Sequence, residues 1–511
     1  MPASQNKFCF AFRHSSLTFN AQYFGMIRKI LGLLGLVLLV LIGVLLFNTF
    51  RAKPWPSYPD SVKLQPLPDS AILHLSGAIQ IPTISISNTS AIDTAAFASF
   101  NTYIEKSYPL IHQRLSKKVI NNFSYVFEWK GQNAGLAPII LMGHYDVVPV
   151  ESAVVDKWTV APFSGLITDS CIWGRGATDD KFGVISILEG VEAMLRKEFV
   201  PKRSIYLCFG HDEEVRGRGA KAIAEWLHQQ KVRPEMVLDE GGQVTVEKAK
   251  GIPRPVAVIG VAEKGYASFE LIVEKPGGHS SIPAKETAID ILAAALHKLR
   301  TKESPARLTP QLKEFLGRVG SSSDQFVNRM ASANMWLFEG VAKSIVESEP
   351  EGYAMMHTTI VPTIIEGGVK ENVIPTKANA VVNTRILTGE TSKTVEDYIR
   401  KTIGDPRVQI SKIGTEDSDP SAATSSQSPA FKRVESAIQK TIPNVIPTPY
   451  QMVGATDSRY YRLISDGVVN FFPMTDAKGF HGMDERLPLI DLQRGIHFIM
   501  TIIEETNLEF K

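Results

Sequence analysis

Three short apolar runs in this chain of 511 residues each end in a cluster of charged side chains, and this pattern most constrains the fold. "PIILMG" leads into His144, "SIYLCFG" leads into Glu213 and Glu214, and "EMVL" leads into Asp239 and Glu240. Stretches with helical periodicity, at 184–197 and 220–230, separate the runs. Strands that alternate with helices in this way predict an α/β domain with a mostly parallel sheet flanked by helices.

A second pattern begins at about residue 263. "YASFELIVEK", "HTTIVPTII" and "ANAVVNTRIL" alternate apolar and polar residues at period two, which is typical of half-exposed antiparallel strands. An amphipathic stretch at 288–300 lies between them. We therefore expect a separate α+β domain at 263–385, inserted between two parts of the main domain at 70–262 and 386–511.

The N-terminal region contains an apolar segment unlike the rest of the chain. Residues 30–47, "ILGLLGLVLLVLIGVLLF", are uncharged and long enough to cross a bilayer as a helix. Arg28 and Lys29 precede it and favour a cytoplasmic N-terminus. We expect a cytoplasmic segment at 1–29, a single transmembrane helix at 30–50 and a proline-rich linker at 51–69. The folded body would then lie on the extracytoplasmic side of the membrane.

A cleaved signal peptide is the alternative for this segment. Its apolar region exceeds the usual 7–15 residues, and "FNTFRAKPWP" offers no small-x-small cleavage site, so we favour a retained anchor. Translation could start at Met1 or at Met26, and the sequence leaves both open.

The overall charge and cysteine content exclude several classes of protein. The formal net charge is +2 and the chain has no dense block of Lys and Arg, so we expect no nucleic-acid partner. Three cysteines are too few for a disulfide scaffold and too scattered for a thiolate metal site.

The charged clusters predict a metal site at one edge of the sheet. Ligands bind open parallel sheets at the carboxyl ends of the strands, and "NFFPM" near the C-terminus is likewise followed by His481. Neighbouring carboxylates become tolerable around cations, and histidines with carboxylates and no cysteine suit zinc, with manganese or cobalt as substitutes. Asp146 could orient His144. The Gly-rich turn of "GRGATDDK", with Asp179 and Asp180 at its mouth, could hold one carboxylate between two metals.

Several motifs, in order, resemble the di-zinc aminoacylase/carboxypeptidase metallopeptidase family. The similarity is greatest to its branch of yeast carboxypeptidase S and vertebrate N-fatty-acyl-amino-acid hydrolase/synthase, and "GAIQIPT" at 77–83 also belongs to that branch. It runs from about residue 75 to the end of the chain. The motifs that carry it are "GHYDVVP" (143–149), "WTVAPFSG" (158–165), "GRGATDDK" (174–181), "GHDEE" (210–214), "VLDEGG" (237–242), "GGHSS" (277–281), "NVIP" (372–375), "GATDSR" (454–459) and "HGMDE" (481–485).

The resemblance implies a role for each metal ligand and for the catalytic base. His144 and Asp239 would bind one zinc ion, Glu214 and His481 the other, and Asp179 both. Glu240 remains an alternative to Asp239, which we prefer. Glu213 would be the general base, Asp146 would orient His144, and the Asp179–Asp180 peptide bond would be cis.

The inserted domain would be the family's lid and, in many members, its dimerisation surface. His279 would stabilise the oxyanion, in some relatives from the other subunit; without the family context, His279 reads as a polar turn residue. Asn372, Arg385 and Arg459 would bind substrate, although Arg459 could instead pair with Asp457 structurally.

The activity implied is hydrolysis of an amide with a carboxylate on its leaving side, in a C-terminal peptide bond or an N-acyl amino acid. The same machinery could run towards synthesis. Two other functions stay open. The first is a dipeptidase or aminopeptidase of the same family, which would recognise a free amine. The second is a membrane-tethered binding protein without catalytic activity.

Overall fold

The computed structural model describes residues 16–56, 59, 62–87, 92–246, 251–414 and 419–510. Its centre is a nine-stranded sheet in the order β1-β2-β6-β3-β7-β17-β9-β16, with β8 paired to β9. The strands are β1 (Ser116–Ile120), β2 (Ser124–Trp129), β3 (Ile139–His144), β6 (Ile205–Gly210), β7 (Met236–Asp239), β8 (Val244–Thr245), β9 (Val256–Glu263), β16 (Ile446–Met452) and β17 (Val468–Asn470).

This sheet is mixed, so the expectation of a mostly parallel sheet is correct only at its centre. β6, β3, β7 and β17 run parallel to one another. β1 and β2 add an antiparallel edge, and β9 meets β17 antiparallel. The four central parallel strands place their carboxyl ends at one edge, which is what the site requires.

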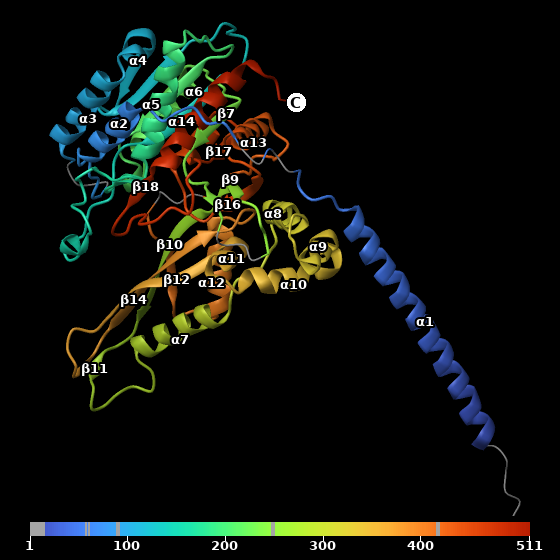
Figure 1. Cartoon of the computed structure of the whole chain (residues 1–511). Helices are drawn as coiled ribbons and strands as arrows, with labels where there is room; N and C mark the ends of the chain where they lie inside the picture. Colours follow the sequence, from blue (N-terminus) through green and yellow to red (C-terminus); the bar gives the residue numbers. More distant parts are fainter. Residues whose placement is uncertain are drawn as a thin grey trace, which may run out of the picture.

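Helices cover both faces of this sheet because its strands are apolar on both sides. Ile139 and Leu141 of β3 join the larger core, whereas Ile140 and Met142 point to the opposite face. The helices on the larger side are α2 (Asp69–Ile79), α3 (Thr94–Ser107), α4 (Pro109–Arg114), α5 (Lys181–Arg196), α13 (Pro429–Thr441) and α14 (Leu489–Glu504). The other face packs against α6 (Arg218–Gln229) (Figure 1).

A second, antiparallel sheet, in the order β12-β14-β10-β15, forms the domain that is expected to be the lid and is called the lid below. Burial alternates along β10 as its sequence predicts, and the lid core includes Phe269, Leu292, Val382 and Ile399. The strands and their helices are β10 (Gly265–Glu274), β12 (Thr359–Gly367), β14 (Lys377–Ile386), β15 (Gln409–Lys412), α7 (Ala288–Thr301) and α12 (Ser392–Ile403). This core therefore extends past the expected boundary at residue 385, because α12 and β15 complete it.

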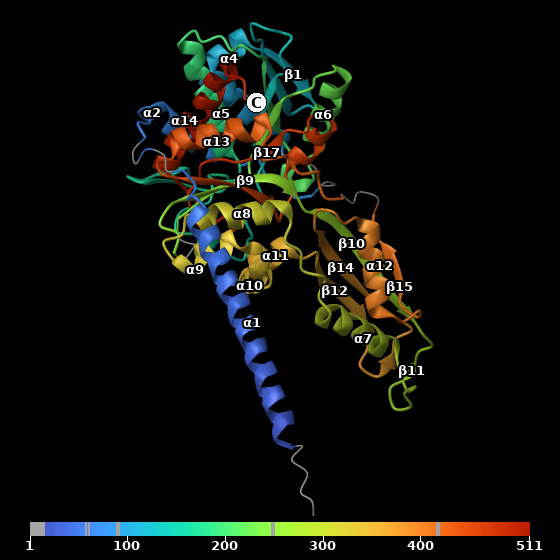
Figure 2. The same cartoon turned by 90° about the vertical axis from the view of Figure 1, so that its right-hand side faces the viewer.

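Four helices between α7 and β12 depart from the expected lid. They are α8 (Pro310–Ser321), α9 (Phe326–Ala333), α10 (Met335–Glu347) and α11 (Pro350–Met356). Val319 of α8 packs with Val256 and Ile446 of the large sheet, so this group lies against the catalytic domain rather than in the lid core (Figure 2).

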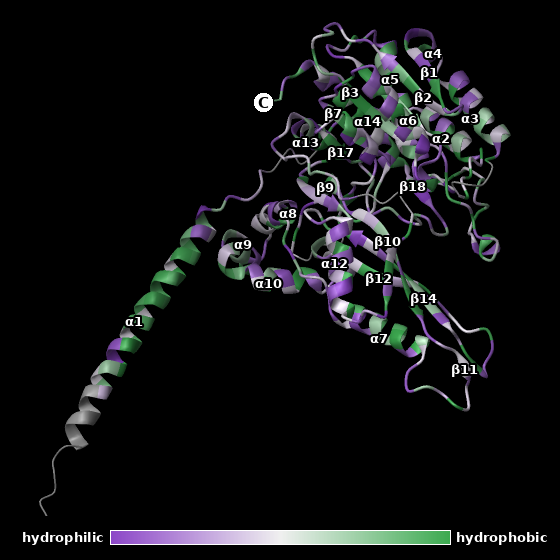
Figure 3. Ribbon diagram, turned by 180° about the vertical axis from the view of Figure 1, so that it is seen from behind, coloured by the Kyte–Doolittle hydropathy of each residue, from purple (hydrophilic) through white to green (hydrophobic). Residues whose placement is uncertain are grey.

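The N-terminal helix α1 (Ser16–Arg51) is the one helix in the described chain that is long and apolar enough to cross a membrane. Its ribbon is mostly hydrophobic, with a hydrophilic band part-way along and hydrophilic residues at the end that joins the body (Figure 3). The segment that follows, expected to be an extended spacer, is bound to the body at Trp55. The backbone N–H of Trp55 donates to Ser322 Oγ at 3.1 Å, and the Arg318 guanidinium lies 4.0 Å from the centre of the Trp55 ring.

Candidate metal centre

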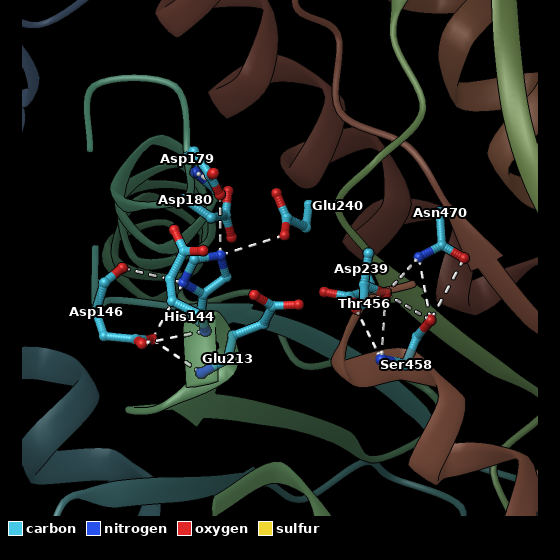
Figure 4. A network of polar contacts seen from close by, with 12 residues as sticks. His144, Asp146, Asp179, Asp180, Glu213, Asp239, Glu240, Thr456, Ser458 and Asn470 are labelled. Atoms are coloured by element: carbon cyan, nitrogen blue, oxygen red, sulfur yellow. Dashed lines mark hydrogen bonds and ion pairs between the residues drawn. The ribbon is translucent and has the colours of Figure 1, made fainter. Parts of the chain in front are cut away.

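The charged clusters that follow the central strands meet at one edge of the sheet (Figure 4). His144 is the last residue of β3 and lies opposite Gly210, the last residue of β6. Glu213 and Glu214 follow in a short 3-10 helix, Glu213–Val215. Glu240 comes directly after β7. Parallel pairing of these strands thus brings together residues that lie far apart in the sequence.

Asp179 lies between two histidines. Its Oδ1 is 3.0 Å from His144 Nε2, and its Oδ2 is 2.7 Å from His481 Nε2. Two groups of potential ligand atoms result, one of His144, Asp179 and Glu240, and the other of Asp179, Glu214 and His481. Asp179 belongs to both groups, which is the arrangement expected of a bridging carboxylate. The Asp179–Asp180 peptide bond is cis, as the resemblance predicts.

The chemistry of these donors fits a pair of divalent cations. Each imidazole directs Nε2 at two carboxylates, and Glu214 Oε1 is buried without a hydrogen-bond partner. Burial raises the pKa of Glu240 to about 7. Hydrogen bonds to Asp179 and Glu214 raise the pKa of His481 to about 10. The shift of His481 shows that its two carboxylate neighbours bring excess negative charge, which cations would offset.

Glu240, rather than Asp239, is directed at the cluster. Glu240 Oε1 lies 3.2 Å from His144 Nε2. Asp239 Oδ2 instead accepts hydrogen bonds from Thr456 Oγ1 at 2.7 Å and from the Ser458 N–H at 3.0 Å. The geometry thus differs from our preference for Asp239, because side chains of successive residues along a strand point to opposite sides.

Asp146 is placed to orient His144. Its backbone carbonyl is 3.1 Å, and its Oδ1 is 3.3 Å, from His144 Nδ1. The same carboxylate accepts the backbone N–H groups of Glu213 and Glu214, at 3.1 and 3.2 Å. Asp146 therefore fixes the imidazole and the turn after β6 relative to each other.

Glu485 is a residue of the site whose role the sequence did not reveal. It is fully buried, and Oε1 accepts the Thr178 N–H at 2.8 Å and the Asp179 N–H at 3.2 Å. Oε2 accepts Arg175 Nη1 at 2.7 Å and the Gly176 N–H at 2.9 Å. Glu485 thus fixes the turn that presents Asp179. The sequence signal was its place four residues after His481 in "HGMDE".

Glu213 faces a cavity of about 970 Å³ beside the cluster, together with Glu214 and His481. Burial raises the pKa of Glu213 well above its usual range; the nearby His144 opposes this shift, and Asp457 and Glu240 add to it. A carboxylate with a raised pKa next to a reaction site suits proton transfer near neutral pH.

The rest of the cavity wall is rich in cations, in contrast to the acidic cluster. Arg385 of the lid sheet contacts the Tyr266 ring and has no ion pair with a carboxylate in the described chain. The basic residues lining the cavity are Arg216, Arg218, Lys221, Lys264, Arg385, Arg459 and Arg462. Such a wall favours an anionic ligand.

Arg459 lines this cavity, but two of its hydrogen bonds are to backbone carbonyls. It donates to Thr456 O at 2.8 Å and to Arg216 O at 3.2 Å. The alternative pairing with Asp457 is not formed as a hydrogen bond, since neither carboxylate oxygen of Asp457 has a hydrogen-bond partner.

His279 and Asn372 lie away from the cluster, at the end of the lid. His279 is in β11 (Gly278–His279), which pairs with β13 (Val373–Ile374), and β11 is at the far tip of the lid in Figure 1. His279 is exposed, and its Nδ1 contacts Ser281 Oγ at 2.7 Å. A single chain therefore does not bring these two residues to Glu213.

Comparison with known proteins identifies the family. The model of peptidase family M20/M25/M40 matches residues 140–505. This chain belongs to that family, here called M20. The M20 chain is 36% identical over 488 residues to a probable carboxypeptidase S-like 2 of Dictyostelium discoideum, covering 93% of each chain. It is 34% identical to the human N-fatty-acyl-amino acid synthase/hydrolase PM20D1, covering 85% of this chain and 87% of that protein.

Two solved structures have a similar fold. An M20 metallo-carboxypeptidase of Sulfolobus solfataricus, Sso-CP2, aligns with a TM-score of 0.62 at 19% identity, covering 86% of this chain and 99% of that one. Human carnosine dipeptidase 1 aligns with a TM-score of 0.56 at 16% identity, covering 86% and 96%. The chain is thus an M20 hydrolase, and its candidate metal-binding groups agree with the metal dependence of that family.

Replacement of Glu240 and Asp239 in parallel tests which one binds metal. Because Glu240 lies against His144 while Asp239 bonds to Thr456 and Ser458, we expect Glu240→Gln to lower the zinc content of dialysed protein from about two ions per chain to about one. Asp239→Asn should retain both ions. Elemental analysis of the folded variants measures this. The reverse order of loss would restore Asp239 as the ligand.

Proposed function

We propose that this M20 protein is a di-zinc hydrolase of amide bonds that carry a carboxylate on the leaving side. The observation behind the proposal is one cavity with two kinds of wall. Glu214 and His481, from one of the two ligand groups that share Asp179, line one part of it, and arginines and lysines line another part. Substrates of this class are C-terminal peptide bonds and N-acyl amino acids. The names of the Dictyostelium and human relatives, a carboxypeptidase and an N-fatty-acyl-amino acid synthase/hydrolase, support both.

The metal ligands proposed are His144 and Glu240 for one ion, Glu214 and His481 for the other, and Asp179 for both. Bound zinc ions would polarise the scissile carbonyl and lower the pKa of the attacking water. Cobalt or manganese are possible substitutes, because the same ligands suit them.

Glu213 is the proposed general base. Its side chain faces the cavity, while its backbone N–H is bound by Asp146, so the carboxylate is presented from a fixed turn. It would accept a proton from the attacking water and then donate this proton to the leaving nitrogen. The same steps in reverse would allow synthesis when both products are abundant.

Arg385 is the proposed partner of the substrate's leaving-side carboxylate. Its guanidinium faces the cavity from the lid sheet, and it has no ion pair of its own in the described residues. Arg459 would add positive charge from the catalytic domain, although its contacts with Thr456 and Arg216 also give it a structural role.

His279 and Asn372 are proposed to act from the lid of a second chain in a homodimer. The two residues share the lid tip, where the Ser280 N–H donates to Asn372 O at 3.2 Å. Asn372 Oδ1 is buried without a hydrogen-bond partner. A second chain would be needed for His279 to reach the oxyanion, since the metal-ligand cluster of the same chain is at the other end of the lid.

The alternative of a dipeptidase or aminopeptidase needs an acidic group to bind a free amine. Glu263 lines the cavity, but its Oε1 already accepts hydrogen bonds from Thr456 and Ser458. Asp419 lines the cavity as well, and its Oδ1 accepts the Ser392 N–H at 2.7 Å. The cationic wall therefore favours recognition of a carboxylate over recognition of an amine.

The helix α1 is proposed to anchor the protein as a single-pass membrane protein, with the catalytic body on the extracytoplasmic side. The support is the length and apolar composition of the helix, and the placement of Arg28 and Lys29 on the N-terminal side of the apolar run.

Replacement of the base tests the catalytic role. We expect Glu213→Gln to lower the turnover of an N-acyl amino acid by about 10²–10⁴-fold, because proton transfer is lost. Its zinc content should stay at the wild-type level, since Glu213 is in neither ligand group. Full activity of Glu213→Gln would contradict the mechanism, and an inactive wild-type protein that binds zinc would favour a binding function.

A substrate panel tests the recognition of the leaving-side carboxylate. We expect wild-type protein to cleave an N-acyl amino acid and to cleave the matching N-acyl amino acid carboxamide poorly, because Arg385 gains an ion pair only with the carboxylate. Arg385→Gln should remove most of this preference by raising KM for the acid. Faster cleavage of dipeptides with a free amine than of their N-acylated forms would favour the dipeptidase alternative.

A further inference from the structure

The helices α9 and α10 expose an apolar surface beside the end of α1. Trp336 is 61% exposed and Ile345 is 65% exposed. We call this surface the juxtamembrane patch; it consists of Phe326, Val327, Trp336, Leu337, Val341 and Ile345, which are all exposed. Leu337, Val341 and Ile345 follow one another at intervals of four residues, so they form one stripe along α10.

The helix α10 is apolar on two sides. Met335 and Val346 pack against a core that includes Leu312 and Met356, whereas the stripe faces away from that core. Glu339 pairs with Lys313 of α8 at 3.4 Å, and Glu347 pairs with His357 at 2.7 Å. A surface helix of a soluble domain normally turns its apolar stripe inward. The outward stripe of α10 therefore needs an apolar environment that the described chain does not supply.

The buried side chain of Asn334 fixes α1 to the start of α10. Asn334 is fully buried, and its Nδ2 donates to Leu45 O at 3.2 Å and to Thr49 Oγ1 at 3.3 Å. Its Oδ1 accepts Asn48 Nδ2 at 2.9 Å. The Phe50 and Phe326 rings also lie 6.2 Å apart. The contact with α1 is therefore specific, and it includes α9.

These contacts set the height of the patch relative to α1. The apolar run of α1 ends at Phe47, and the next two residues, Asn48 and Thr49, are those bound to Asn334. If α1 crosses the bilayer, the end of its apolar run marks the boundary between acyl chains and headgroups. Figures 1 and 2 both show α9 and α10 beside this end of α1.

We propose that α9 and α10 insert the juxtamembrane patch into the headgroup and upper acyl region of the bilayer that α1 crosses. This inference rests on the anchoring role proposed for α1. Tryptophan with aliphatic neighbours is typical of such interfacial surfaces. The body is thereby attached to the membrane by two adjoining elements, and its rotation about α1 is restricted. A bilayer is a better occupant than a second protein chain, because the patch continues directly from the membrane-spanning helix.

Fluorescent labelling of the full-length chain in phosphatidylcholine vesicles tests the proposal. Single-cysteine variants, with the native cysteines replaced by alanine and activity retained, would carry an environment-sensitive dye at Leu337→Cys or Val341→Cys. Leu38→Cys, within α1, reports on the anchor. Val119→Cys is the matched control, since Val119 is an exposed aliphatic residue of β1, at the opposite end of the molecule from α1 in Figure 2.

We expect lipids that carry a quencher near the headgroup to quench the dye at Leu337 and Val341 but not at Val119. Quenching at Leu38, by lipids labelled deep in the acyl chain, together with water-exposed dyes at Leu337 and Val341 would overturn the proposal and leave the anchor intact. A water-exposed dye at Leu38 would reject the anchor itself. Shielding at Leu337 that persists in detergent and increases with protein concentration would assign the patch to a second copy of the chain.

Discussion

The candidate site depends on one carboxylate, Asp179, that lies between two imidazoles. Its position is set by the network of Glu485, whose Oε1 accepts the Thr178 and Asp179 N–H groups. Glu485 and His481 belong to the same loop. The loop therefore supplies one of the two imidazoles and also the carboxylate that holds the turn of Thr178 and Asp179. Because His144 comes from the first part of the catalytic domain and His481 from the second, Asp179 joins the two parts of the chain at the site.

Around this shared carboxylate, opposite charges are separated in space. The acidic cluster lies at the edge of the large sheet, where cations can offset it, and the basic groups line the remaining wall of the same cavity. An amide substrate with a leaving-side carboxylate matches this division, because its carbonyl would face the cluster while its carboxylate faces Arg385. The lid contributes Arg385 from its sheet to the wall of this cavity.

Much of this arrangement could be predicted from the sequence, because local patterns specify it. Apolar runs that end in charged residues predicted the central strands, and the structure brings His144, Asp179, Glu214 and His481 together as the resemblance implies. The choice between Asp239 and Glu240 stays a prediction: the geometry directs Glu240 at His144 and Asp239 at Thr456 and Ser458, and sequence alone does not say which of two neighbouring side chains faces the cluster. Glu485 was missed because its function lies in hydrogen bonds to a turn that is 306 to 309 residues distant.

Other features depend on contacts between segments distant in the sequence. The antiparallel edges of the large sheet, the addition of α12 and β15 to the lid core, and the docking of Trp55 on Ser322 follow from tertiary packing rather than from local periodicity. The motifs of His279 and Asn372 belong to the same family resemblance as those of the metal ligands, but the two residues do not lie at the site. Their distance from it is a property of the lid's extended shape, which no local pattern encodes.

The most direct test of the account is the zinc content of Asp179→Asn. Because both ligand groups share this carboxylate, we expect the single replacement to lower the occupancy of both sites together, from about two zinc ions per chain towards none. Asp212→Asn is the control, because Asp212 Oδ1 accepts the Gly219 N–H at 2.8 Å and lies outside both groups. Folded Asp179→Asn protein that keeps both ions, or that loses only one, would contradict the central claim.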